Sequence, residues 1–210
     1  MLPKSRNLNE VSNWRPIAIL PILCKIVGRL LYGRLLPILE ASQSNDQFGF
    51  RANRRIEDVF GIIENIIGKT NEWNLLLWMI SLDLKKAFDR IEFGPLFAAL
   101  REQGVPDAYI QLLSILYQNQ KGTVDGKMFF DIQRGVKQGD VLSAMFLNAG
   151  IEIVFRRWKT RICSEGFLLD VEAERLTNVR YADDVLLFGK SEKEIQVMTE
   201  ILVMPANRKY

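Results

Sequence analysis

Tyr181-Ala182-Asp183-Asp184 lies between two apolar runs, Leu176–Tyr181 and Val185–Gly189, and this pattern predicts a β-hairpin with two adjacent acids at its tip. The two negative charges repel each other, so a polar environment or a cation must compensate them. Aspartate is also a common turn residue, and a turn without any chemical role is the competing interpretation. The surroundings of the hairpin decide between the two.

A third acid, Asp83, ends the near-continuous apolar run Leu75–Leu84, which predicts a buried central strand. If this strand packs beside the hairpin, Asp83 joins Asp183 and Asp184 at one edge of a sheet. Carboxylate ligands without histidine or thiol suit Mg²⁺ or Mn²⁺, and Mg²⁺ usually binds through one or two carboxylates plus substrate phosphates. Two such ions support nucleotidyl transfer. The competing interpretation of Asp83 is an acid in a turn after a strand.

The composition excludes several classes of site. The chain has 210 residues, 48% hydrophobic and 25% charged, as expected for a globular protein of one large or two small domains. It has no histidine, which excludes Ser-His-Asp and Cys-His catalysis and the usual zinc sites. Its two cysteines, Cys24 and Cys163, have apolar neighbours and are predicted to be reduced core residues. No secretory signal or membrane span is visible, so we expect an intracellular protein, in the nucleus or the cytoplasm.

Positive charge gathers near the N-terminus. Residues 1–60 carry nine Lys and Arg side chains against five Asp and Glu, a local excess larger than the net charge of +3. This distribution suits a bound polyanion, and a solvated surface is the alternative.

Apolar periodicity and turn residues predict the remaining elements. Asp140 is placed to cap one helix, Gly68 is interpreted as the C-cap of another, and Asp125-Gly126 predicts a hairpin turn. The expected helices cover residues 22–40, 55–68, 95–102, 106–117, 141–162 and 192–203.

Five sequence blocks keep their order along the chain. They are Asn13–Ile17 followed by Lys25 and Arg34, Gln47–Arg51, Leu82–Asp89, Arg134–Ser143, and Tyr181–Asp184. Together they resemble the reverse transcriptase domain of non-LTR (LINE-type) retrotransposons, whose blocks include "R-P-I", "Q-x-G-F-R" and "R-G-V-x-Q-G-D-P-L-S". Because all five blocks agree in order and register, chance is a poor explanation of the resemblance.

The resemblance implies an α/β (α+β) right-hand polymerase fold, with an antiparallel palm sheet packed on helices and a mostly helical fingers lobe. Residues 1–75 would form the fingers and residues 76–203 the palm, with connections between them in 84–135 and an irregular tail at 204–210. The palm sheet would include strands near 76–83, 123–132 and 175–189. The whole would be one reverse transcriptase domain.

The resemblance also implies an RNA-directed DNA polymerase that uses two Mg²⁺ ions, with Mn²⁺ as a substitute. Asp83 and Asp183 would be the main metal ligands, and Asp184 would complete the acidic cluster. The implied partners are an RNA template, a DNA primer and deoxynucleoside triphosphates, with no membrane.

Other residues would contact the nucleotide. Phe88 would lie beneath the sugar and exclude a 2′-hydroxyl, although core packing could also explain its ring. Gln138 and Gly139 would lie against the nucleotide and template, and Arg51 would face the triphosphate unless it is a surface charge. Weaker candidates for nucleic-acid contacts are Arg54, Arg55 and Lys137.

The chain also departs from the family pattern. Val141 and Ala144 stand where the family has proline, which should loosen the start of that helix without removing a chemical group. We expect an upstream endonuclease, the next palm element and the thumb to be missing. A remnant that only binds nucleic acid is therefore the alternative function, and an RNA-dependent RNA polymerase is disfavoured by Phe88.

Overall fold

The computed structural model describes residues 2–3, 9, 13–15, 17–118, 120–124, 126, 128–162, 166–167 and 175–203. Cys163, Asp125 and the predicted tail at 204–210 lie outside the described residues. The chain forms two compact units, each built from two segments: Met1–Ser42 with Lys86–Gly150, and Gln43–Lys85 with Ile151–Tyr210. We call them the first unit and the second unit. The division into fingers and palm at residue 75 stays a prediction.

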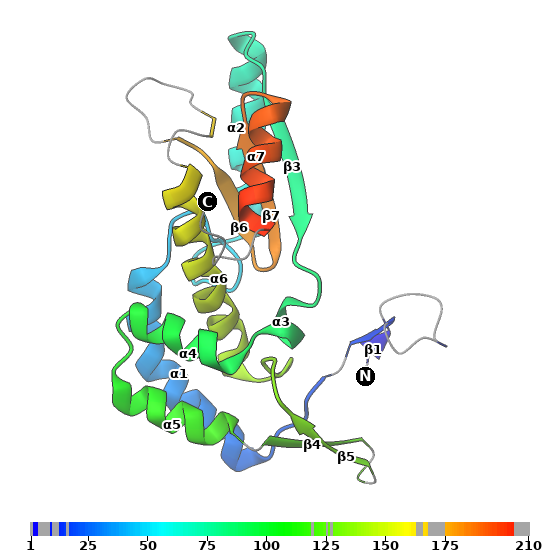
Figure 1. Cartoon of the computed structure of the whole chain (residues 1–210), viewed down its shortest axis with the longest axis vertical. Coiled ribbons are helices and arrows are strands. Elements are labelled where there is room, and N and C mark those ends of the chain that lie inside the picture. Colours follow the sequence, from blue (N-terminus) through cyan, green and yellow to red (C-terminus); the bar gives the residue numbers. More distant parts are fainter. Residues whose placement is uncertain are drawn as a thin grey trace. The chain divides into compact units, whose positions relative to one another are not determined.

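The first unit is mainly helical (Figure 1). It contains α1 (Ile22–Ser42), α3 (Ala87–Arg90), α4 (Phe93–Glu102), α5 (Asp107–Tyr117) and the first part of α6 (Val141–Ile162). Its core is formed by apolar side chains that recur once per helical turn, because that spacing places them on one face of each helix. Its fully buried members include Leu35, Leu96, Leu100, Leu113 and Phe146.

The short strands of the first unit form separate ladders. β1 (Leu2–Pro3) pairs with β2 (Trp14–Arg15), and β4 (Gln120–Val124) pairs with β5 (Met128–Ile132), both antiparallel. The hairpin predicted near 123–132 is therefore confirmed, with Gly126 at φ +70° in its turn. Its inclusion in the palm sheet is wrong, because β4 and β5 hydrogen-bond only to each other among the described strands.

Helix α1 buries only part of its apolar surface. Leu31, Leu35 and Leu39 are buried, whereas Leu23 and the other apolar residues of its first two turns are exposed. Cys24 lies in this exposed part, so the prediction of a core cysteine is wrong at that position. Apolar neighbours in the sequence do not by themselves bury a residue, because burial depends on what packs against that part of the helix.

The second unit contains a three-stranded antiparallel sheet in the order β3-β7-β6 (Figure 1). The strands are β3 (Trp78–Asp83), β6 (Asn178–Tyr181) and β7 (Asp184–Gly189). The strand before Asp83 is thus an edge strand and not the central one that was predicted, and Trp78 and Met79 are each 41% exposed. An apolar run alone does not distinguish an edge strand from a central one.

Two helices cover the sheet. α2 (Ile56–Glu72) packs on β6, and α7 (Glu192–Val203) packs on β7 and β3. Leu186 and Phe188 belong to the hydrophobic cluster with α2, whereas a Cβ at Gly189 would meet Ile195 of α7. Because successive strand residues point to opposite faces, α2 and α7 cover opposite faces of β7.

The ends of the helices test the predicted caps. The Asp140 carboxylate accepts a hydrogen bond from the Leu142 N–H at 3.2 Å, which confirms the cap of α6. Gly68 lies inside α2, so its prediction as a C-cap is wrong. The helix ends at Glu72, and Asn74 follows with a φ of +52°, the left-handed conformation that asparagine also adopts after helices. None of the helices in the described residues is long and apolar enough to cross a membrane.

Candidate active site

The three acids predicted from the sequence meet at one end of the sheet in the second unit. Asp83 is the direct cross-strand partner of Asp184, at the last pair of the β3–β7 ladder. Asp183 belongs to the two-residue turn between β6 and β7, and its carbonyl accepts a hydrogen bond from the Leu84 N–H at 3.3 Å. The β3–β7 pairing thus brings together acids that are far apart in the sequence.

The carboxylates repel one another. Partial burial raises the pKa of Asp184, and the negative charges of Asp183 and Asp83 raise it further. Within the described part of the chain, no ion pair involves any of the three. The cluster is therefore a site where a cation would be stabilised.

The chemistry of these side chains fits a hard divalent cation. The three groups offer only oxygen atoms, the ligands that Mg²⁺ prefers. Among the described residues, no group of three or more acidic, histidine or cysteine side chains is arranged so that it could hold a metal ion by itself. An open set of carboxylates fits Mg²⁺, because this ion keeps waters or substrate phosphates as its remaining ligands. The role of the three acids as metal ligands stays a prediction.

A buried arginine lies just before the acidic turn, and the sequence analysis missed it. Arg180 is 0% exposed, and its Nη2 lies 2.6 Å from Asp46 Oδ1 and 2.9 Å from Glu152 Oε2. Its guanidinium also stacks over the Phe155 ring, 4.4 Å from the centroid. A basic residue inside an apolar strand was the available signal, because a buried charge requires a partner.

The acids around Arg180 remain charged. Burial by itself would raise the pKa of Asp46, but the charges of Arg180 and Lys159 outweigh it and lower the pKa. Burial by itself would also raise the pKa of Glu152. Hydrogen bonds from Ser44, Arg180 and Arg156, together with the charge of Arg180, outweigh burial and lower this pKa. This network ties strand β6 to the loop before residue 47 and to helix α6.

The predicted basic residues of the second unit make local contacts. Arg51 Nη1 donates to the carbonyls of Ser44 at 2.6 Å and Gln47 at 3.0 Å. Arg54 donates to the Asn45 side chain and lies over the Phe48 ring. The Arg55 N–H donates to Asp58 in a capping box at the start of α2. Arg51, Arg54 and Arg55 thus stabilise the loop and helix start, and their contacts with phosphates stay predictions.

In the first unit, the loop 134–140 packs against α3. The Val136 N–H donates to the Phe88 carbonyl at 2.7 Å, and Gln138 Nε2 donates to Asp89 Oδ1 at 3.4 Å. The half-buried Phe88 also packs against the hydrophobic cluster of this unit. The predicted nucleotide contacts Phe88 and Gln138 therefore lie in neighbouring segments.

Gly139 is required by the backbone of this loop. Its φ is +107°, and a Cβ would lie 2.9 Å from the Ala18 carbonyl oxygen. The Ala18 N–H donates to the Gln138 carbonyl at 2.8 Å, which holds the two segments together. The Lys137 carbonyl accepts a hydrogen bond from Ser143 Oγ at 2.7 Å. The loop conformation is thus fixed on both sides of Gln138.

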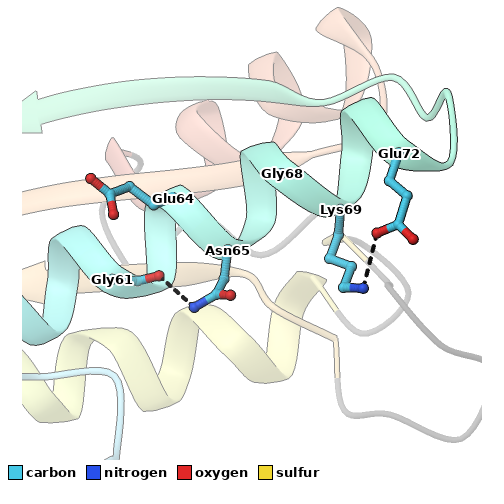
Figure 2. A pocket seen from close by; sticks show the side chains of 6 residues that line it. All are labelled: Gly61, Glu64, Asn65, Gly68, Lys69 and Glu72. Carbon is cyan, nitrogen blue, oxygen red and sulfur yellow. Dashed lines mark hydrogen bonds and ion pairs between the residues drawn. The ribbon is translucent and has the colours of Figure 1, made fainter.

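A hollow on helix α2 is unrelated to these residues. Figure 2 shows its lining, in which Asn65 donates to the Gly61 carbonyl and Lys69 pairs with Glu72 within the same helix. None of the predicted site residues lines it. Asn65, Lys69 and Glu72 thus bond within their own helix.

Comparison with known proteins identifies relatives over most of the chain. The model of the family "Reverse transcriptase (RNA-dependent DNA polymerase)" matches residues 2–208. The retrovirus-related Pol polyprotein from the type-1 retrotransposable element R2 of Popillia japonica is 25% identical over 91% of this chain. The Transposon TX1 uncharacterized 149 kDa protein of Xenopus laevis is 28% identical over 93%. The chain spans 27% and 15% of the length of these two relatives.

Solved structures show the same fold. Apo telomerase from Candida tropicalis, truncated from its C-terminal domain, superposes with a TM-score of 0.59 at 14% identity, covering 84% of this chain and 36% of that one. Telomerase from Candida albicans, solved with a fragment of telomeric RNA, gives a TM-score of 0.58 at 15% identity, covering 85% and 32%. At this identity the likeness establishes the fold alone, which is the predicted α/β right-hand polymerase fold.

Proposed function

Because this chain belongs to the reverse transcriptase family, we propose that it carries the site of an RNA-directed DNA polymerase. The reaction adds deoxynucleotides to the 3′-hydroxyl of a DNA primer on an RNA template. The observation that carries the proposal is the direct pairing of Asp83 with Asp184, beside Asp183, at the end of the β3–β7 ladder. Two divalent ions held by these acids would supply the positive charge that activates the attacking hydroxyl and stabilises the leaving pyrophosphate.

The side chains of the second unit have separate roles in this proposal. Asp83 and Asp183 are the main metal ligands, and Asp184 adds negative charge to the same cluster. The raised pKa of Asp184 supports this assignment, because a bound cation would offset both the burial and the neighbouring negative charges that raise it. Mg²⁺ is the proposed ion, with Mn²⁺ as its substitute.

The loop and helix of the first unit select and hold the nucleotide in this proposal. Phe88 excludes ribonucleotides by occupying the space of a 2′-hydroxyl. Gln138 and Gly139 contact the incoming nucleotide and the template, and the absence of a side chain at Gly139 permits a close backbone approach. Arg51 contacts the triphosphate, and the weaker contacts with nucleic acid come from Arg54, Arg55 and Lys137.

Primer extension tests the proposal. A poly(rA) template with an oligo(dT) primer is incubated with the protein and dTTP, first with Mg²⁺ and then with Mn²⁺. We expect extension by the wild-type chain and none by Asp183→Asn. Asp107→Asn, an exposed acid of α5, is the matched control and should extend like the wild type.

The other outcomes separate the alternatives. Extension that survives in Asp183→Asn would contradict the assignment of the acids. RNA binding at low salt without any extension would indicate that this chain only binds nucleic acid. Phe88→Ala tests the sugar contact, because it should raise ribonucleotide incorporation more than deoxynucleotide incorporation.

A further inference from the structure

The turn that carries Asp183 has a backbone conformation that its sequence disfavours. Ala182 and Asp183 join β6 to β7, and Ala182 has a φ of +59°. Ala182 is the only residue of this turn with a positive φ, and glycine is the preferred residue at such a position. The left-handed conformation costs a non-glycine residue about 1–2 kcal/mol, so surrounding contacts must hold it.

Gln47 makes those contacts. Its side-chain Oε1 accepts a hydrogen bond from the Ala182 N–H at 3.1 Å, and its Nε2 donates to the Ala182 carbonyl at 3.3 Å. Oε1 also accepts the Gly49 N–H at 2.9 Å, which fixes the orientation of the amide. Gln47 is 0% exposed, so water does not compete for these bonds. One buried amide thus holds both backbone polar groups of the disfavoured residue.

The backbone around Gln47 is held independently of its side chain. The Phe48 N–H donates to the Arg180 carbonyl at 2.9 Å, and the Arg180 N–H donates to the Asp46 carbonyl at 2.7 Å. Gly49 lies so close to the turn that a Cβ there would be 2.2 Å from the Ala182 nitrogen. Replacing the Gln47 side chain should therefore free the turn while the segment stays paired with β6.

We infer that Gln47 is a positioning residue, whose side-chain amide fixes the Ala182–Asp183 turn and thereby the placement of the Asp183 and Asp184 carboxylates. The Asp183 carbonyl accepts the Leu84 N–H, so a rotation of this turn also changes its relation to the end of β3. A carboxylate beside a metal binds it well only when its orientation is fixed by surrounding groups. The inference rests on the proposed function, because it assigns the carboxylates to a cation.

Gln47→Met removes all three hydrogen bonds at nearly constant volume. Gln103→Met is the matched control, because Gln103 is also buried and its Nε2 donates to two backbone carbonyls, in the first unit. Mn²⁺ binding to the 210-residue chain is measured by electron paramagnetic resonance, without nucleic acid. We expect Gln47→Met to weaken Mn²⁺ binding about 10- to 100-fold and Gln103→Met to leave it unchanged, at comparable losses of thermal stability.

Hydrogen exchange gives a second readout that needs no metal. The Ala182 amide should lose its protection in Gln47→Met, whereas the amide of Leu187, in the centre of β7, should keep it. An Ala182 amide that stays protected would overturn the inference. Where Asp183→Asn abolishes Mn²⁺ binding, equal Mn²⁺ affinities of wild type and Gln47→Met would overturn it as well.

Failure of the proposed function gives a different pattern. If the acids do not bind the ion, wild type and Asp183→Asn bind Mn²⁺ equally, and the Ala182 amide alone decides the role of Gln47. If Asp183→Asn loses Mn²⁺ and Gln47→Met retains it, the metal assignment stands and the inference about Gln47 is refuted.

Discussion

Asp83 and Asp184 face each other as direct cross-strand partners at the last pair of the β3–β7 ladder. Like charges directly opposite each other destabilise a sheet. Partial burial raises the pKa of Asp184, and the negative charges of Asp183 and Asp83 raise it further. A site built in this way makes the protein less stable in the absence of a cation.

Asp184→Asn should therefore stabilise the cation-free protein at pH 7, by about 0.2–1 kcal/mol, because it removes one charge from the cluster. Thermal unfolding in the presence of EDTA measures the change. Glu64→Gln removes an exposed acid of α2 and should leave the midpoint nearly unchanged. Equal shifts of the unfolding midpoint in the two variants would contradict a specific repulsion within the acidic cluster, because they would show an effect of net charge alone.

Arg180→Met should destabilise the protein by about 3–5 kcal/mol, because it leaves Asp46 and Glu152 as buried acids without their central partner. Urea unfolding gives the free energy. Arg156→Met removes a partly exposed partner of Glu152 and should cost less than about 1 kcal/mol. A similar loss in both variants would contradict a central role of Arg180.

Acid should unfold the protein partly through Asp46 and Glu152. Both have a lowered pKa in the folded state, so the unfolded state binds more protons as the pH falls below their ordinary values of 3.8 and 4.5. Stability from these groups is present above those values and is lost as the pH falls through the folded pKa. Melting temperatures measured from pH 3 to 6 should rise with pH.

Asp46→Asn should flatten this pH dependence, because the amide does not titrate. Asp184 contributes with the opposite sign, since its raised pKa favours the folded state at lower pH. A pH profile of Asp46→Asn identical to that of the wild type would contradict the role of the network in acid stability.

Gly49→Ala and Gly61→Ala should have opposite effects on stability. A Cβ at Gly49 would lie 2.2 Å from the Ala182 nitrogen and 2.8 Å from its Cα, so the backbone must move, at roughly 1–3 kcal/mol. Gly61 lies in α2 with no atom within 4 Å of such a Cβ, and alanine there should stabilise by about 0.5–1 kcal/mol. Urea unfolding of both variants checks the contrast, and a stable Gly49→Ala would contradict the close approach.

Much of the fold and of the candidate site follows from local sequence. The hairpin at Asp183, the helix that Asp140 caps and the strand that ends at Asp83 are marked by apolar period and turn residues. The pairing of this strand with the hairpin was posed as a condition from the residues and was expected from the family resemblance, and the structure shows it.

The remaining features depend on contacts between distant segments. The edge position of β3 and the exposure of Cys24 depend on what packs against them, which no local pattern reports. Arg180 and Gln47 have partners on separate elements, so their roles are visible only in three dimensions. At Gly68, a local signal was given too much weight. Glycine is common just after helices, but α2 continues through Gly68 and ends at Glu72.

The pairing of β3 with β7 has a consequence for synthesis of the chain. Among the described strands, β3 hydrogen-bonds only with β7, and all of residues 84–183 lie between the two paired acids. On the ribosome, β3 therefore emerges long before β7 and remains without its strand partner until β7 has been synthesised. Contacts between residues so far apart in the sequence form slowly. Until they form, the unpaired strand edges can associate with other chains and promote aggregation. Nascent chains of this protein should accordingly depend on chaperones until the acidic hairpin has emerged.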